Sequence, residues 1–187
     1  MTIPNLITVI RIILAPVFIV YMINDQLLYA LIIFLICSLT DGIDGMVARF
    51  FNQKSNLGAY LDPLADKLLL VSAFVTLAVK QIMPAWLTVV VIARDVMILL
   101  GIFILLLNRL DFKMKPSMIS KINTCFQFLL LIFLLSKDFL RFPTPFYSTF
   151  FYLTALFTIS SGLHYMYYWF KILGDGLGGA DHKKKDD

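Results

Sequence analysis

The sequence predicts an all-α membrane protein, a polytopic bundle of about six transmembrane helices. Hydrophobic residues account for 60% of its 187 residues, and the mean hydropathy of +0.86 is far above that of a soluble domain. Several apolar runs reach about 20 residues, the length that a helix needs to cross a hydrocarbon core of ~30 Å. Short polar or proline-containing segments separate these runs, so each run can form a span of its own.

Each predicted span follows from a local signal. The first begins after Pro4, which suits the first turn of a helix, and the polar residues 24–26 end it. The clearest later breaks are residues 80–84 and 142–145, both of which contain proline. The six spans are expected at about Leu6–Ile23, Leu27–Phe50, Ala59–Val79, Ala85–Leu107, Met118–Leu135 and Thr144–Phe170.

The distribution of lysine and arginine predicts how the spans are oriented. One set of loops holds Lys54, Arg109, Lys113, Lys115, Lys121, Lys171 and Lys183–Lys185. The opposite set holds Lys80, Lys137 and Arg141. Because the cation-rich side is usually cytoplasmic, both termini are expected on the cytoplasmic side of the cell (inner) membrane. The net charge of +4 is ordinary for such a protein and does not predict nucleic-acid binding.

Residues 1–173 are expected to form a single membrane domain. No internal repeat or second domain is evident in the sequence. Residues 174–187, with their glycine pairs and lysine run, are expected to form a disordered cytoplasmic tail. The two cysteines, Cys37 and Cys125, lie far apart in apolar runs and are not expected to form a disulfide or a metal site.

Acidic residues are concentrated at the end of the second span. On a helix, Asp41, Asp44, Gly45, Ala48 and Arg49 fall at i, i+3, i+4, i+7 and i+8, which is a single stripe. An ionisable group at bilayer depth costs about 2.5–3.5 kcal/mol, so carboxylates here need a cation to neutralise them. The small residues leave room beside the carboxylates, and the planar fork of Arg49 suits phosphate oxygens.

A second acidic stripe begins the third span. Gly58, Asp62 and Asp66 fall at i, i+4 and i+8, and Pro63 predicts a kink near the start of this helix. The short link between the spans predicts antiparallel neighbours whose stripes face each other. Four carboxylates then form an oxygen-only pocket that suits Mg²⁺, Mn²⁺ or Ca²⁺.

This pocket predicts a diphosphate site. Two bound metals could hold the bridging phosphates, and one carboxylate could instead act as general base on an incoming hydroxyl. The alternative is that the aspartates are helix caps, turn residues and salt-bridge partners of Arg49 or Lys67. Asn5, Thr8 and Arg11 recur every three residues, so they share a face that either points into the polar cavity or lets Arg11 reach the interface.

The acidic segment resembles the signature of the CDP-alcohol phosphotransferase family. That signature reads D-x-x-D-G-x-x-A-R, eight residues, then G-x-x-x-D-x-x-x-D, and every position matches from Asp41 to Asp66. The resemblance implies a six-span homodimer that transfers a phosphatidyl group from CDP-diacylglycerol to an alcohol acceptor and releases CMP.

The same resemblance implies a role for each signature residue. Two divalent ions, Mg²⁺ or Mn²⁺, would be bound, and Asp66 would also be the base that takes the proton of the acceptor hydroxyl. Arg49 would contact the diphosphate. The implied metal ligands are Asp41, Asp44, Asp62 and Asp66, and the implied residues that bind the CDP-lipid are Asn5, Thr8, Gly45, Ala48, Arg49 and Gly58.

Two acceptors fit the resemblance, and both bear a phosphate. The surroundings of Arg94 and Lys121 resemble the branch that uses phosphatidylglycerol and makes cardiolipin. In users of glycerol-3-phosphate we expect further cations near positions 102 and 123, where this chain has Ile102 and Asn123. Arg94 and Lys121 are therefore expected to bind the acceptor phosphate. The alternative is that Arg94 pairs with Asp95 or the aspartate cluster, and Lys121 with lipid headgroups.

Two other classes of protein remain as rivals. An intramembrane prenyltransferase also uses aspartate motifs on a diphosphate, but usually with more spans and more widely separated motifs. A divalent-cation transporter would explain the carboxylates but leaves Gly45, Ala48, Arg49 and Gly58 without a role.

Overall fold

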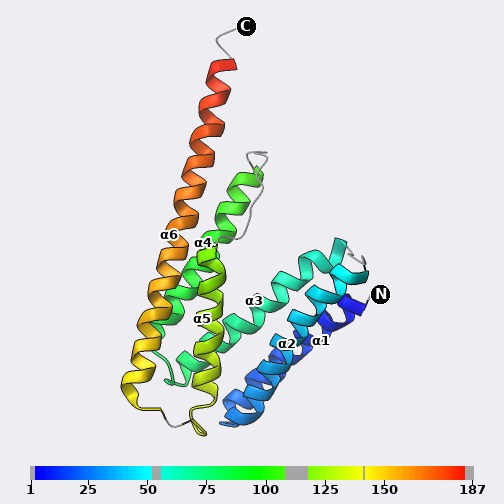
Figure 1. The fold of residues 1–187 in the computed structure, drawn as a ribbon, viewed down its shortest axis with the longest axis vertical. Coiled ribbons are helices and arrows are strands. Elements are labelled where there is room, and N and C mark those ends of the chain that lie inside the picture. The colour runs from blue at the N-terminus through cyan, green and yellow to red at the C-terminus, as the bar shows by residue number, and fades with distance from the viewer. Residues whose placement is uncertain (1–2, 52–55, 108–117, 141, 184–187) are drawn as a thin grey trace. The chain divides into compact units, whose positions relative to one another are not determined.

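The structure is a computed structural model that describes residues 3–51, 56–107, 118–140 and 142–183 (Figure 1). Side chains are described for fewer residues, and those of residues 3–9, 41–51 and 56–66 lie outside the described set. Over the described residues the chain forms six α-helices and no strand, which confirms the all-α prediction. The helices are α1 (Ile3–Ile23), α2 (Leu27–Phe51), α3 (Asn56–Val79), α4 (Ala85–Leu107), α5 (Met118–Leu135) and α6 (Thr144–Lys183).

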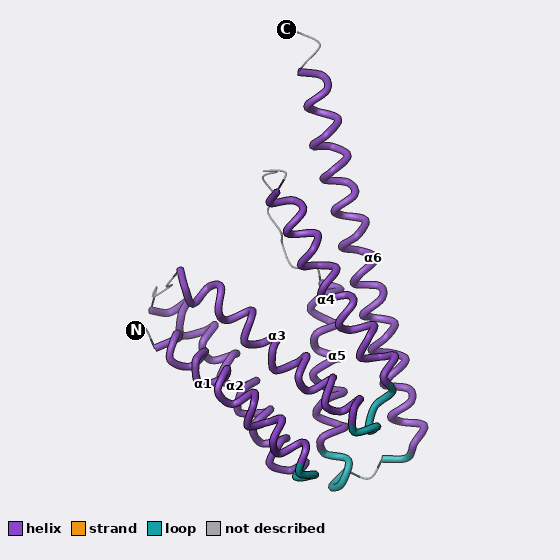
Figure 2. The backbone as a smooth tube through the Cα atoms, turned by 180° about the vertical axis from the view of Figure 1, so that it is seen from behind, coloured by secondary structure: helices purple, strands orange, loops and turns teal. Residues whose placement is uncertain are grey.

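The last helix differs most from its prediction. α6 was expected to end at Phe170, but it continues to Lys183 and takes in most of the segment expected to be a disordered tail (Figure 2). Glycine costs about 1 kcal/mol per residue in a helix interior, much less than the ~3 kcal/mol of proline, so a helix can continue through it. An existing helix also extends without a new nucleation step. The boundary expected at Gly174 is therefore not the end of the helix.

Two of the helices are long and apolar enough to cross a membrane over the described residues. These stretches are Ala85–Ile104 in α4 and Met118–Leu135 in α5. Among the residues whose side chains are described, three further apolar stretches are Ile10–Ile23, Leu27–Thr40 and Lys67–Val79. The acidic segment from Asp41 to Asp66 lies between the last two of these stretches in the sequence. Large apolar side chains such as Leu99 and Phe103 are exposed, as expected for helices that face lipid.

The chain divides into two compact units, which are described separately. Unit 1 comprises residues 1–85 and 131–143 and therefore contains α1, α2 and α3. α1 packs against both α2 and α3. Its core includes the fully buried side chains of Phe18, Phe34 and Phe74, and the first two have ring centroids 6.3 Å apart.

A lysine ties the ends of two helices together in unit 1. The Lys80 ammonium, just past α3, donates hydrogen bonds to the carbonyl oxygens of Met22 (2.6 Å) and Ile23 (3.1 Å) at the end of α1. It also pairs with the Asp25 carboxylate. A cation at this position stabilises the negative end of the α1 dipole and satisfies carbonyls that lack a helical partner. The contact therefore fixes the register of α3 against α1.

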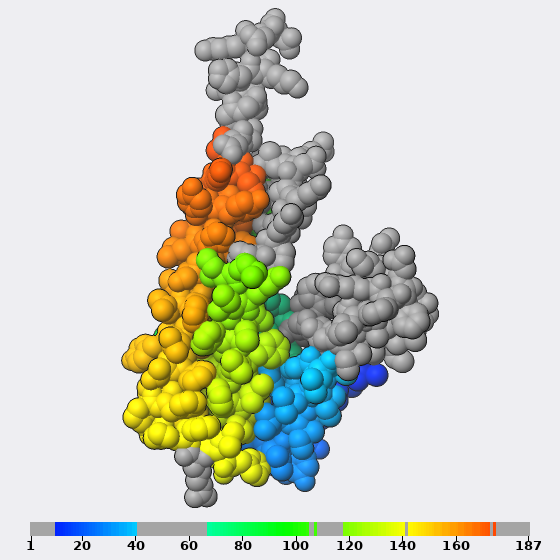
Figure 3. Space-filling model, in the orientation of Figure 1, coloured from blue at the N-terminus to red at the C-terminus, as the bar shows by residue number. Residues whose placement is uncertain are grey.

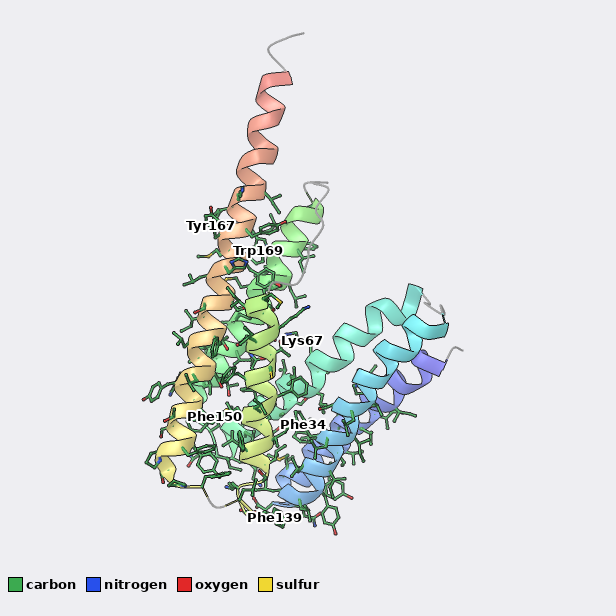
Figure 4. All side chains as sticks on the ribbon, viewed as in Figure 1. Phe34, Lys67, Phe139, Phe150, Tyr167 and Trp169 are labelled. Carbon is green, nitrogen blue, oxygen red and sulfur yellow. The ribbon has the colours of Figure 1, made fainter. Side chains whose placement is uncertain are left out.

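Unit 2 comprises residues 86–130 and 144–187, and so contains most of α4, much of α5 and α6. Side chains of α5 and α6 lie side by side on the face shown in Figure 3. Phe126 of α5 stacks on Phe157 of α6 with centroids 4.4 Å apart. At the α4–α6 contact, Trp169 (Figure 4) is buried, and a Cβ on Gly101 would lie 2.0 Å from its ring. A residue without a side chain is therefore needed at position 101.

Candidate active site

The acidic signature lies on two continuous helices. α2 runs through Asp41, Asp44 and Arg49, and α3 runs through Gly58 and Asp66. The helical spacing that defined the two stripes therefore holds for the backbone. The side chains of the predicted site residues in this segment, and of Asn5 and Thr8, lie outside the described residues. Whether the four carboxylates converge stays a prediction.

The two acidic stripes lie near the end of α2 and the start of α3, which a short link joins. Only residues 52–55 separate the end of α2 at Phe51 from the start of α3 at Asn56. Asp44 lies seven residues before Phe51, and Asp62 lies six residues after Asn56. At a rise of 1.5 Å per residue, both positions are about 10 Å along their helices from the link. The backbone is thus compatible with a shared site near the link.

Arg11 of α1 is an additional candidate residue at this site. Its side chain is only 2% exposed, so it does not reach outward as one alternative for it required. The hydrogen bond from Lys80 to the Ile23 carbonyl gives a common reference point for α1 and α3. Arg11 lies 12 residues before Ile23, and Asp66 lies 14 residues before Lys80. Measured along their helices from this contact, the positions of Arg11 and Asp66 therefore differ by less than about one helical turn. The three-residue spacing of Asn5, Thr8 and Arg11 was the sequence signal for this inward face.

A metal site elsewhere finds no support in the described part of the chain. Among those residues, no three or more His, Cys, Asp or Glu side chains gather in a way that could hold an ion. Cys37 is buried and Cys125 is exposed. The segment 41–66 contains neither His nor Cys, so its donors are oxygen atoms alone. That donor set fits Mg²⁺ or Mn²⁺.

The two residues expected to bind the acceptor lie in unit 2, in different surroundings. Arg94 is 5% exposed, and its guanidinium pairs with Asp95 at 2.7 Å, which is the contact that the charge-pairing alternative expected; its role at the acceptor site stays a prediction. Lys121 is exposed on α5. It lines a shallow depression of about 530 Å³ together with Ser120, Thr124, Cys125 and Phe128. Arg94 also donates a hydrogen bond to Ser120 Oγ at 2.6 Å, so it is linked to the residue next to Lys121.

Position 123 lies inside unit 2. Asn123 is fully buried on α5, and its Oδ1 accepts a hydrogen bond of 2.8 Å from the Thr158 hydroxyl of α6. The Thr158 hydroxyl in turn lies 3.5 Å from Gln127. Asn123 therefore makes a polar contact between α5 and α6. In users of glycerol-3-phosphate we expected a cation near this position.

Comparison with known proteins agrees with the resemblance noted from the sequence. The model of the CDP-alcohol phosphatidyltransferase family matches residues 1–161. The human cardiolipin synthase (CMP-forming) is 34% identical over 184 residues, which are 89% of this chain and 61% of the human protein. A cardiolipin synthase and mitochondrial hydrolase fusion protein of Schizosaccharomyces pombe is 37% identical over 180 residues, 88% of this chain and 30% of that protein.

A bacterial relative matches over nearly its whole length. The CDP-diacylglycerol–glycerol-3-phosphate 3-phosphatidyltransferase of Bacillus subtilis is 33% identical over 179 residues, 87% of this chain and 92% of the relative. The chain thus spans about three fifths of the human cardiolipin synthase but almost all of the Bacillus enzyme. Because the family match covers residues 1–161 of 187, the chain belongs to the CDP-alcohol phosphatidyltransferase family.

Proposed function

We propose that this protein transfers a phosphatidyl group from CDP-diacylglycerol to an alcohol acceptor and releases CMP. The observation that carries the proposal is the complete aspartate signature, placed on two continuous helices that a four-residue link joins. The names of relatives from both branches, which match 87–89% of this chain, support the same class of reaction.

The four aspartates would hold two divalent cations, Mg²⁺ or Mn²⁺. Their oxygen-only donor set fits these ions, and the apolar stretches on either side make uncompensated carboxylates costly. When bound, the ions would neutralise charge on the carboxylates and on the diphosphate. The four proposed ligands are Asp41, Asp44, Asp62 and Asp66.

The remaining signature residues would bind and orient the CDP-lipid. Arg49 would contact the diphosphate through its planar fork. Asp66 would take the proton from the acceptor hydroxyl while that oxygen bonds to the lipid-side phosphorus. The bond from this phosphorus to the bridging oxygen breaks, and CMP leaves with the electron pair. Gly45, Ala48 and Gly58 would leave room for the cytidine, and Asn5 and Thr8 would complete the binding face.

Charge around Arg94 and Lys121 favours phosphatidylglycerol as the acceptor, with cardiolipin as the product. Over α4 and α5 the charged residues are Arg94, Asp95 and Lys121, which sum to +1. A phosphodiester carries one negative charge, whereas glycerol-3-phosphate carries close to two and needs more cationic donors. Glycerol-3-phosphate remains the second candidate, because the Bacillus relative named for that acceptor is matched over 92% of its length.

An acceptor comparison tests the proposal. The purified full chain in nanodiscs is given CDP-diacylglycerol and Mg²⁺ or Mn²⁺, with either phosphatidylglycerol or glycerol-3-phosphate, and CMP release is followed. We expect CMP and cardiolipin with phosphatidylglycerol. If turnover occurs only with glycerol-3-phosphate, the acceptor is glycerol-3-phosphate and not phosphatidylglycerol. If neither acceptor gives CMP, the proposal that this protein is such an enzyme is wrong. Metal flux into sealed vesicles without CMP release would favour a transporter.

We further infer a homodimer in the inner membrane with the active site and both termini on the cytoplasmic side. The charge distribution of the loops supports this orientation. Labelling of single introduced cysteines at residue 53 and at residue 139 from outside sealed inner-membrane vesicles and intact cells would test it. Labelling of residue 53 in intact cells would contradict the orientation.

A further inference from the structure

The Arg94 side chain is enclosed by groups from α4, α5 and α6. One terminal nitrogen, Nη1, donates to Asp95 Oδ1 at 2.7 Å on the same helix. The other, Nη2, donates to Ser120 Oγ of α5 at 2.6 Å and to Ser161 Oγ of α6 at 2.8 Å. A single guanidinium nitrogen therefore joins two helices that are distant in sequence, and Ser161 is fully buried at this contact.

α6 shapes a larger surface around this guanidinium. Tyr165, one turn after Ser161, places its ring centroid 5.8 Å from Arg94 Cζ, which is within the range of a cation–π contact. Gly162 lies against the aliphatic part of the side chain, where an added Cβ would be 3.6 Å from Arg94 Cγ. The Ser161 hydroxyl, the Tyr165 ring and Gly162 of α6 thus all lie against the Arg94 side chain, and together they fix the plane of the guanidinium.

The cluster has a feature that stability alone does not explain. Arg94 Nε is buried and has no hydrogen-bond partner among the described residues. A buried donor of this kind is costly, and a buried ion pair can often be replaced by apolar residues without loss of stability. Retaining a charged group under these conditions points to a role in function.

We propose that Ser161 is a positioning residue of the acceptor site. By accepting a hydrogen bond from Arg94 Nη2, it holds the guanidinium against Ser120, which lines the same depression as Lys121. The charge of Arg94 then has a fixed orientation next to the place where Lys121 meets an anionic phosphodiester. This inference rests on the proposed function, and it adds α6 to the helices that determine acceptor binding.

The test is a comparison of Ser161→Ala with the unchanged protein in nanodiscs. CMP release is measured while phosphatidylglycerol and CDP-diacylglycerol are varied separately. We expect the KM for phosphatidylglycerol to rise about three- to tenfold, which corresponds to the loss of one hydrogen bond. The KM for CDP-diacylglycerol should change by less than about twofold. Ser161→Thr keeps the hydroxyl and should restore most of the acceptor affinity.

Thr154→Val is the matched control. Thr154 is also fully buried on α6, but its hydroxyl has no hydrogen-bond partner among the described residues, so its loss should leave both KM values unchanged. Equal rises of both KM values in Ser161→Ala would show general loosening of the fold and would overturn the proposal. In an Arg94→Lys background, Ser161→Ala should add little, because its effect passes through the guanidinium.

The outcomes separate this inference from the proposed function. If the unchanged protein releases no CMP with either acceptor, the proposed function fails and the inference falls with it. If the unchanged protein is active and Ser161→Ala has its normal KM for phosphatidylglycerol, the proposed function stands and only the positioning role of Ser161 is wrong.

Discussion

Unit 1 and unit 2 deal with charge inside apolar helices in opposite ways. In unit 1, α2 and α3 carry four aspartates in the signature, while buried Arg11 lies at a similar level on α1. Among the described side chains of unit 2, the buried charges are Arg94 and Asp95, which pair with each other, and the hydroxyls of Ser120 and Ser161 also accept hydrogen bonds from the guanidinium.

This difference separates a site that needs added cations from one that does not. The acidic segment has more carboxylates than cations, so it favours binding of divalent ions and the diphosphate that they accompany. The Arg94 cluster is neutral within itself, so it needs no added cation, and its internal contacts fix the orientation of the guanidinium. We therefore assign the donor lipid and metals to unit 1, and the acceptor to unit 2, as a proposal that mutations can test.

The largest expected effect is at the acidic segment. Asp66→Asn keeps an oxygen that can ligate metal but removes the proton acceptor, so turnover should fall by about 10²–10⁴-fold. CMP release measures this, and binding of CDP-diacylglycerol should remain measurable in the same preparation. Turnover equal to that of the unchanged protein would remove Asp66 from the role of base.

Breaking the neutral pair of unit 2 should affect stability strongly. Arg94→Met leaves Asp95 buried without the charge of its neighbour, so the free energy of unfolding should fall by about 3–5 kcal/mol. The double change Arg94→Met with Asp95→Leu should recover most of this loss. SDS titration of the purified protein measures both. A double variant as unstable as the single one would show that the pair is not self-balanced.

A smaller effect is expected where α4 packs against α6. Gly101→Ala places a methyl group 2.0 Å from the Trp169 ring, and the shift that follows should cost about 1–3 kcal/mol in unfolding free energy. Gly174→Ala is the control, because a Cβ there meets no atom within 4 Å. It should be neutral or slightly stabilising in the same titration. Equal behaviour of the two variants would argue against the close α4–α6 contact.

The smallest effect concerns the contact that holds α1 and α3 in register. Lys80→Met removes an ion pair whose Asp25 side chain is 82% exposed, together with two hydrogen bonds to carbonyls of α1. The expected loss is about 0.5–1.5 kcal/mol in unfolding free energy. Asp25→Asn should lose less, because the carbonyl contacts remain. If Asp25→Asn is the more damaging change, the ion pair and not the carbonyl contacts fixes the register.

The fold class, the approximate helix positions and the candidate catalytic segment could all be predicted from the residues alone. α4 and α5 have the bounds that hydropathy predicted, because apolar runs that end at polar or proline-containing segments leave little choice of boundary. α1 and α3 begin at Ile3 and Asn56, slightly before the predicted Leu6 and Ala59, since polar first turns carry no hydropathy signal. The spacing of the signature residues from Asp41 to Asp66 was enough to indicate the family, because it depends on residue types and intervals alone.

The contacts of Arg11 and Arg94 could not be predicted from the sequence and come from the packing of the helices. Helical periodicity places Arg11 and Arg94 on a face of their own helix but does not say which helix packs there, because that depends on contacts between residues far apart in sequence. The structure buries Arg11 within unit 1 and encloses Arg94 between Asp95, Ser120 and Ser161.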